Sequence, residues 1–240
     1  MSRLGFALTW LGHSAFHIQT DPGGPSILID PWLDNPKAPE NAKALAETAT
    51  LILVTHGHFD HIAGIASLAS RTAATVASSF EITAELGAEG VSEQQLVGFN
   101  KGGAATLQGV TVTLTQAFHS SSLPSPDGRA RSLGDPCGMV IELPNGTVIY
   151  NTGDTCVFGD MALIAELYHP TVLMLPIGDF YTMGPRQAAK ACELVAPQWI
   201  IPQHYGTFPG LTGTPDALRK LLARSLADRV LAPPPGETIR

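Results

Sequence analysis

The stretch LILVTHGHFDHIAG, which begins at Leu51, constrains this chain more than any other. Its first four residues are branched and aliphatic, which predicts a strand buried on both faces. His56 and His58 lie two residues apart and share one side of an extended backbone, whereas Asp60 and His61 fall where a helical pattern begins. One strand-to-helix corner therefore offers two pairs of ligands aimed at two neighbouring points, which suits two adjacent metal ions.

Three further polar residues each follow an apolar, strand-like run. His119 follows TVTLTQAF, Asp154 follows TVIYNTG, and His204 follows WIIPQ. A dinuclear site needs about three protein ligands per metal, one of them bridging, with room left for water. We predict that Asp154 is the bridge, because a carboxylate has two oxygens. The predicted sets are His56, His58 and His119 for one ion, and Asp60, His61 and His204 for the other.

Length and charge narrow the class of protein. The 240 residues are 44% hydrophobic, and we expect one domain over residues 1–240. The longest apolar runs are strand-sized and no signal-peptide pattern opens the chain, so we expect no stable membrane insertion and a cytoplasmic location. A net charge of −7 with thinly spread basic residues argues against a nucleic-acid partner. The three cysteines indicate no disulfide framework; thiolate ligation by Cys137 or Cys156 is a minority alternative.

The remaining pattern alternates between strands and helices. Strand clusters occur in both halves, and Asn145-Gly146 predicts a tight hairpin turn. A helix is predicted from about His61 to Ser70, and a surface loop over residues 123–136. Because each strand cluster is followed by helices, we expect an α/β fold with two sheets face to face and helices outside.

These motifs resemble those of the metallo-β-lactamase superfamily. THGHFDH fits the family pattern T-H-x-H-x-D-H at all its defining positions, and His119, Asp154 and His204 follow in the family's order. WLGHSAF, FHSSS, NTGDT and PQHYGTFP are similar to small stand-alone hydrolases of the L-ascorbate-6-phosphate lactonase and N-acyl-phosphatidylethanolamine phospholipase D types. The resemblance covers nearly the whole chain and implies a four-layer αβ/βα sandwich. It specifies the substrate poorly.

The chemistry implied is metal-dependent hydrolysis. Two divalent ions about 3.5–4 Å apart share a water and lower its pKa to about 7, which provides a hydroxide nucleophile at neutral pH. The hydroxide would cleave an ester, lactone, amide or phosphodiester of a small molecule. An imidazole-rich site suits zinc, while manganese, iron and nickel remain open.

Several residues have open roles beside the predicted ligands. We expect Asp60 to ligate and also to orient the hydroxide. His13, in a turn between two N-terminal strands, is a candidate for substrate binding or proton donation, with a structural role as the alternative. Asp30 ends a strand and either supports a ligand histidine or caps a turn.

The pocket walls are expected from three loops, residues 31–40, 120–136 and 176–184. Tyr205, beside His204, is predicted to bind substrate by donating to an oxyanion. Asp179 is predicted to bind substrate from the third loop. A homo-oligomer is permitted by the low charge and apolar composition.

Other functions stay open on the same fold. A di-iron oxidoreductase is disfavoured, because that type carries an acid where this chain has His58. A mononuclear iron dioxygenase can keep the histidine motif, and iron content with oxygen uptake would identify it. A non-catalytic, metal-stabilised binding module is a further alternative, although such proteins usually lose ligands. A nuclease would need a basic surface that the sequence lacks.

Overall fold

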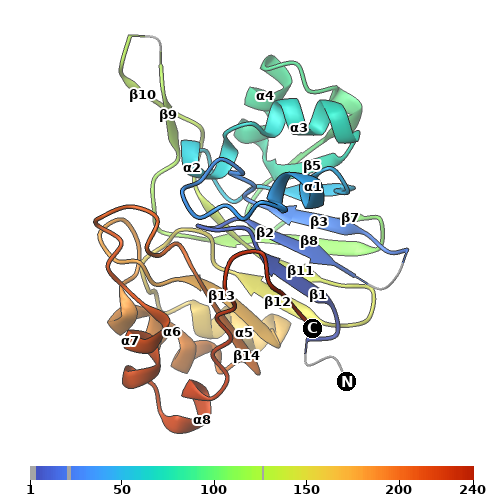
Figure 1. Cartoon of the computed structure of the whole chain (residues 1–240). Coiled ribbons are helices and arrows are strands. Elements are labelled where there is room, and N and C mark those ends of the chain that lie inside the picture. Colours follow the sequence, from blue (N-terminus) through green and yellow to red (C-terminus); the bar gives the residue numbers. More distant parts are fainter. Residues whose placement is uncertain (1–3, 21–22, 126) are drawn as a thin grey trace.

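Two β-sheets lie against each other and helices cover their outer faces, as Figure 1 shows. This computed structural model describes residues 4–20, 23–125 and 127–240. The first sheet contains, in spatial order, β15 (Thr238–Ile239), β1 (Ala7–Trp10), β2 (Phe16–Gln19), β3 (Ser26–Ile29), β4 (Leu51–Leu53), β5 (Thr75–Ser79) and β6 (Leu96–Phe99). The second contains β14 (Trp199–Gln203), β13 (Val172–Pro176), β12 (Val148–Asn151), β11 (Cys137–Glu142), β8 (Val110–Gln116) and β7 (Ala104–Leu107).

Alternate side chains of the central strands face two different cores. In β4, Leu51 and Leu53 point into the core between the sheets, whereas Ile52 packs against the outer helices. In β13, Met174 faces the central core and Leu173 faces the helices on the other side. All five side chains are fully buried, which explains why these strands appear as unbroken apolar runs in the sequence.

The helices form the two outer layers. Those associated with the first sheet are α1 (Ala42–Ala46), α2 (Phe59–Ile62), α3 (Ile65–Thr72), α4 (Phe80–Ala88) and the 3-10 turn η1 (Glu93–Gln95). Those packed on the second are α5 (Met161–Tyr168), α6 (Pro185–Val195), α7 (Pro215–Leu221) and α8 (Arg224–Ala227). Proline at the first helical position starts both α6 and α7. The four-layer α/β sandwich expected from the sequence is therefore present.

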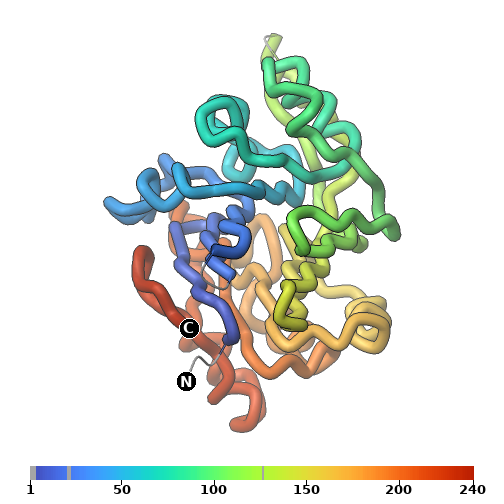
Figure 2. The backbone as a smooth tube through the Cα atoms, turned by 90° about the vertical axis from the view of Figure 1, so that its right-hand side faces the viewer, coloured from blue at the N-terminus to red at the C-terminus, as the bar shows by residue number. Residues whose placement is uncertain are grey.

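Along the chain, strands β1–β6 belong to the first sheet, and β7, β8 and β11–β14 belong to the second. In Figure 2 the teal segments lie above the orange and red ones, and the C-terminal segment returns to the first strand. There β15 pairs with β1, so that Leu8 lies opposite Ile239. None of the described helices is long and apolar enough to cross a membrane. One domain over residues 1–240 stays a prediction.

Two local expectations were wrong, and one strand was missed. The helix predicted from His61 to Ser70 is divided into α2 and α3, because Gly64 adopts a left-handed conformation between them. The predicted loop 123–136 contains the hairpin strands β9 (Ser122–Pro124) and β10 (Ala130–Ser132), which project from the body of the molecule (Figure 1). Strand β6 was not expected, since its LVGF sequence carries a glycine and its side chains are half-buried or exposed.

Candidate metal centre

Strands from both sheets end at one place, and each leads into a predicted ligand. β4 leads to the THGHFDH loop, in which His58 is the N-cap of α2. β8, β12 and β14 are followed by His119, Asp154 and His204. The structure thus brings all seven predicted ligands together. Their role in metal binding remains a prediction.

The first donor group consists of His56, His58 and His119. His56 Nε2 lies 3.0 Å from His58 Nδ1, and His119 Nε2 lies 3.2 Å from the same atom. Three nitrogens bound at about 2.0–2.1 Å to one tetrahedral zinc ion would lie about 3.3 Å apart. Gly57 allows this geometry, because a Cβ there would come within 2.6 Å of Leu133 Cδ1. The spacing of the three nitrogens suits a single ion.

The second donor group consists of Asp60, His61 and His204, whose donor atoms lie within 4.8 Å of one another. Asp154 lies between the two groups. Its Oδ2 atom is 3.0 Å from His204 Nε2 and 3.4 Å from His61 Nε2. It is also 3.7 Å from His119 Nε2 in the first group. The predicted bridging position of Asp154 agrees with this placement.

Three buried atoms of the predicted ligands have no hydrogen-bond partner among the described residues: His61 Nε2, Asp154 Oδ1 and His204 Nδ1. Leaving such atoms unpaired is costly, so buried polar atoms normally bind something. A set of imidazoles with two carboxylates is typical of zinc sites and is also compatible with manganese, iron or nickel. The residues present therefore fit divalent metal ions.

Asp30 sets which nitrogen of two ligand histidines is protonated. Its carboxylate accepts a hydrogen bond from His61 Nδ1 at 2.8 Å, which leaves the Nε2 lone pair of His61 free. It also accepts from Thr55 N at 2.8 Å and from Thr55 Oγ1 at 2.7 Å. Because the Thr55 hydroxyl proton is used there, this oxygen accepts from His56 Nδ1 at 3.1 Å. Asp30 therefore supports His61, a predicted ligand, which is the first of the two roles considered for it.

His13 contacts the second donor group. Its Nε2 lies 2.9 Å from Asp60 Oδ2, and its Nδ1 lies 3.0 Å from Thr207 Oγ1. An ionised carboxylate only accepts, so His13 Nε2 donates to Asp60 and Nδ1 accepts from the Thr207 hydroxyl. Burial lowers the pKa of His13 to about 4, so its imidazole is neutral at pH 7. His13 thus holds Asp60 in place, and one of its ring nitrogens lies within 4.8 Å of the donor atoms of Asp60, His61 and His204.

The protonation states of the predicted ligands favour binding of a cation. Burial lowers the pKa of His56, His58 and His119, which keeps them neutral as metal ligands must be. Burial acts against the ionised form of Asp154, but the neighbouring imidazoles hold its pKa well below the usual range. Burial also acts against protonation of His61, but nearby carboxylates raise its pKa well above the usual value. The carboxylate charge at this point therefore attracts a proton or a metal ion.

A cavity of about 820 Å³ opens over both donor groups. Its walls include Phe180 and Tyr181 from the expected loop 176–184, and Phe208 from the segment after His204. The aromatic residues around the cavity were not singled out from the sequence. Three of these residues lie in the segments PIGDFYTMGP (residues 176–185) and PQHYGTFP (residues 202–209), but sequence alone did not indicate that the two segments meet.

Tyr205 and Asp179, the predicted substrate contacts, are not among the described residues that line this cavity. Tyr205 stacks on Trp10 with ring centroids 4.9 Å apart, and burial raises the pKa of its hydroxyl to about 12. Asp179 is exposed and its carboxylate accepts from Phe180 N at 2.8 Å. Their contact with substrate stays a prediction, which this placement does not favour.

Backbone strain is concentrated around the cavity. Five non-glycine residues there have positive φ, a conformation that costs free energy and often marks functional sites. They are His13 (54°), Asp30 (44°), Asp179 (71°), Phe180 (60°) and His204 (54°). The fold therefore holds predicted ligand, supporting and wall residues in a backbone conformation that is uncommon for residues other than glycine.

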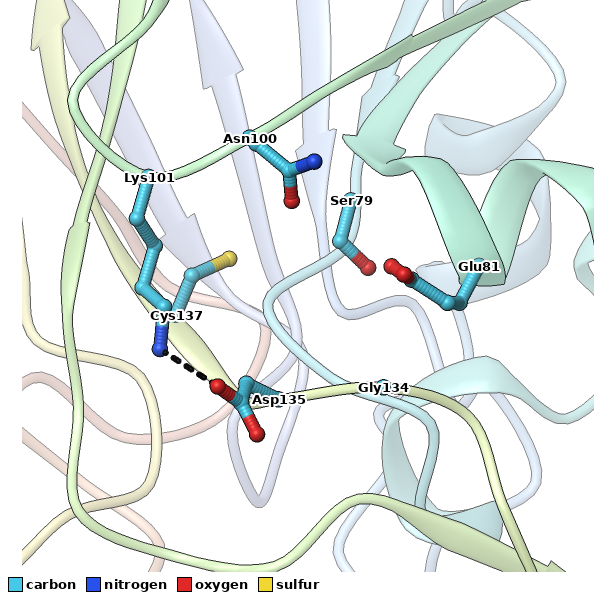
Figure 3. Close-up of a pocket in the computed structure, with 7 residues that line it drawn as sticks. All are labelled: Ser79, Glu81, Asn100, Lys101, Gly134, Asp135 and Cys137. Carbon is cyan, nitrogen blue, oxygen red and sulfur yellow. Dashed lines mark hydrogen bonds and ion pairs between the residues drawn. The ribbon is translucent and has the colours of Figure 1, made fainter.

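The cysteines lie apart from the donor groups. Cys137 lines a second cavity of about 270 Å³, shown in Figure 3 with Ser79 and with Lys101 paired to Asp135. Its Sγ donates to the Thr55 carbonyl at 3.0 Å, and burial raises the pKa of the thiol. Cys156 is exposed, and neither cysteine belongs to a donor group within the described ranges. The alternative of thiolate ligation therefore has no support here.

Comparison with known proteins identifies the family. The family described as "Beta-lactamase superfamily domain" matches residues 26–205, which hold all seven predicted ligands. The chain belongs to the metallo-β-lactamase superfamily. A metallo hydrolase from the archaeon Ignicoccus hospitalis has a similar structure, with a TM-score of 0.85 and 36% identity over 98% of this chain and 97% of that one.

Curated relatives narrow the assignment within the superfamily. A protein of Herpetosiphon aurantiacus named "UPF0173 metal-dependent hydrolase" is 50% identical over 232 residues, covering 96% of this chain and 95% of the relative. A protein of the same name from Chloroflexus aurantiacus is 48% identical and covers both chains fully. This metallo-β-lactamase-superfamily chain therefore belongs to the UPF0173 metal-dependent hydrolases. The finer resemblance to lactonases and phospholipases stays a prediction.

Proposed function

We propose that this protein hydrolyses an ester, lactone, amide or phosphodiester of a small molecule with the help of two divalent metal ions. The observation that carries the proposal is the position of Asp154, whose Oδ2 lies within 3.0–3.7 Å of histidines from both donor groups. A single structural ion would need only one of these groups. Zinc is the metal we expect, with manganese, iron and nickel as alternatives.

The chain's own residues would hold the two ions. His56, His58 and His119 would hold one ion, Asp60, His61 and His204 the other, and Asp154 both. Two ions so held would lower the pKa of a shared water and thereby supply a nucleophile at neutral pH.

Residues behind the ligands would keep this geometry. Asp30 holds His61 directly and His56 through Thr55, so that each presents Nε2. His13 Nε2 holds Asp60 Oδ2, which directs the carboxylate toward His204. Groups fixed in advance cost no reorganisation during the reaction, and this is where a protein gains most of its catalytic effect.

Removing the bridge tests the proposal. Asp154→Ala should lose metal and reduce hydrolysis by more than about 100-fold, since losing an outer partner of a metal ligand alone costs about 10–100-fold. His58→Ala should behave likewise. Asp160→Ala, which removes an exposed carboxylate at the start of α5, is the matched control. Each protein would be metal-quantified and assayed on esters, lactones, amides and phosphodiesters. Full activity of Asp154→Ala would exclude the proposed mechanism.

The same samples test the other proposals. Oxygen uptake by iron-loaded protein without hydrolysis would favour the iron-dependent oxidoreductase or dioxygenase alternative. Two bound ions without turnover of any panel member would favour a non-catalytic binding module. We also propose a small-molecule substrate rather than nucleic acid, a cytoplasmic location without membrane insertion, and a possible homo-oligomer. These can be checked by nucleic-acid binding, cell fractionation and light scattering.

A further inference from the structure

Four aromatic side chains surround the mouth of the cavity over the donor groups; we call them the aromatic rim. They are Phe59, Phe180, Tyr181 and Phe208. Phe59 is 51% exposed, Tyr181 57% and Phe180 73%. A contiguous exposed apolar surface around a cavity is typical of a ligand-binding site rather than of ordinary protein surface.

One side of the rim is fixed by ring packing. Phe208 stacks on Trp32 with ring centroids 5.8 Å apart, and Phe59 meets Trp32 edge-on at 5.5 Å. Phe208 also meets the His13 ring at 5.6 Å. These contacts join the apolar wall directly to the residue that holds Asp60. A group packed on Phe208 would therefore lie beside the second donor group.

The other side is held by a strained loop. Asp179 and Phe180 both have positive φ, and Tyr181 N donates to the Asp179 carbonyl at 2.7 Å. The Phe180 ring lies over Gly210, where an added Cβ would be 3.3 Å from Phe180 Cγ. The loop thus presents two adjacent rings, Phe180 and Tyr181, with centroids 4.7 Å apart. Strain of this kind persists where the surrounding structure imposes it, often at ligand sites.

The charged side chains that line the cavity are all acidic. None of the described residues that line it is lysine or arginine, and the ionisable acids there are Asp60 and Asp154. Recognition of a phosphate or carboxylate away from the metals normally uses arginine, lysine or a helix N-terminus. The rim therefore offers an anionic substituent no side-chain partner and adds the cost of removing it from water.

We infer that the substrate carries an uncharged alkyl or aryl group that packs in the aromatic rim while its scissile bond lies over the donor groups. This inference rests on the proposed hydrolytic function and names its substrate class. The volume of about 820 Å³ accommodates a small organic molecule. Neutral esters and lactones with apolar substituents fit, whereas phosphodiesters with charged headgroups fit poorly.

A series of 4-nitrophenyl esters tests the inference on the metal-loaded protein. The acetate, butanoate and hexanoate lengthen the apolar group, and the monoester of adipic acid places a carboxylate at its end. We expect kcat/KM to rise about 4-fold per buried methylene, or about 250-fold over the four methylenes from acetate to hexanoate, mainly through KM. The adipate should fall at least about 10-fold below the hexanoate.

Substitutions in the aromatic rim test whether the dependence on acyl chain length arises there. Phe180→Ala and Phe208→Ala should each reduce the acetate-to-hexanoate ratio to below about 10-fold. Phe80→Ala removes an equally exposed phenylalanine at the start of α4, away from this cavity, and should keep the full ratio. Circular dichroism of each variant would show that it is folded.

A binding measurement separates the two possible failures. If no ester is turned over, calorimetric titration with butanol, hexanol and octanol reports the rim alone. Affinity that rises with chain length in the natural protein, and not in Phe180→Ala, would support the inference while the hydrolytic function fails. The inference is overturned by rates and affinities independent of chain length. A preference for the adipate or for an ω-trimethylammonium ester also overturns it, as does an unchanged ratio in both rim variants.

Discussion

The floor of the cavity and its rim are built in opposite ways. The floor consists of the seven predicted ligands, and its central members His56, His61, Asp154 and His204 are at most 2% exposed. Several floor side chains are held by a second contact, such as that of His61 to Asp30. The rim consists of four aromatic side chains. Phe59, at the start of α2, and the adjacent Phe180 and Tyr181 are more than half exposed, whereas Phe208 is half-buried.

This difference separates two tasks. Metal binding requires fixed donor atoms, so the floor is placed at the ends of strands buried on both faces. Substrate selection requires only a surface of the right shape and polarity, which loops supply. Changes to the floor should therefore alter metal content and turnover together, whereas changes to the rim should alter preference among substrates. The predictions below test that separation.

Asp30→Asn should have the largest effect among residues behind the floor. The amide cannot replace a carboxylate that accepts from Thr55 N, Thr55 Oγ1 and His61 Nδ1 at once. We expect metal affinity to fall about 10–100-fold, measured by competition with a coloured chelator. Unchanged affinity for both ions would show that the orientation of His61 and His56 does not depend on Asp30.

His13→Ala should have a smaller effect, because His13 supports one ligand rather than two. We expect turnover to fall about 10-fold with metal content retained, as Asp60 loses the hydrogen bond from His13 Nε2. Metal analysis and turnover on the same sample decide the role of His13. Loss of one ion would make it a ligand, which its position within reach of the second donor group allows.

Phe180→Ala should have the smallest effect on stability. Its ring is 73% exposed, so the free energy of unfolding in urea should change by no more than about 0.5 kcal/mol. Phe16→Ala, which truncates a fully buried ring between the sheets, should cost about 3–5 kcal/mol in the same assay. A loss above about 2 kcal/mol for Phe180→Ala would mean that the rim is structural.

The same contrast explains what the sequence could predict. The floor was predictable because metal ligands are restricted to a few residue types, and THGHFDH places four of them after a buried strand. The four layers were predictable because Leu51–Leu53 is apolar at every position, which requires burial on both faces. For Asp30 the sequence left two roles open, support of a ligand histidine or capping of a turn, because an acid at the end of a strand often caps a turn.

The rim was not predictable, because no residue type marks it. Phe59, Phe180 and Phe208 lie far apart in sequence, and a phenylalanine alone is equally consistent with the core. The helix break at Gly64 was missed because Ile62, Ile65 and Leu68 keep a helical spacing across it. Strand β6 was missed because its LVGF sequence is short, carries a glycine and is at most half-buried. Contacts between distant loops are decided by the assembled fold, which a local pattern does not encode.

The most direct test is a crystal structure of the protein with zinc and anomalous data collected at the zinc edge. We expect two anomalous peaks, one within about 2.0–2.2 Å of His56 Nε2, His58 Nδ1 and His119 Nε2, the other at the same distances from Asp60, His61 and His204. Asp154 should contact both. A single peak, or two peaks that Asp154 does not join, would contradict the proposed dinuclear centre.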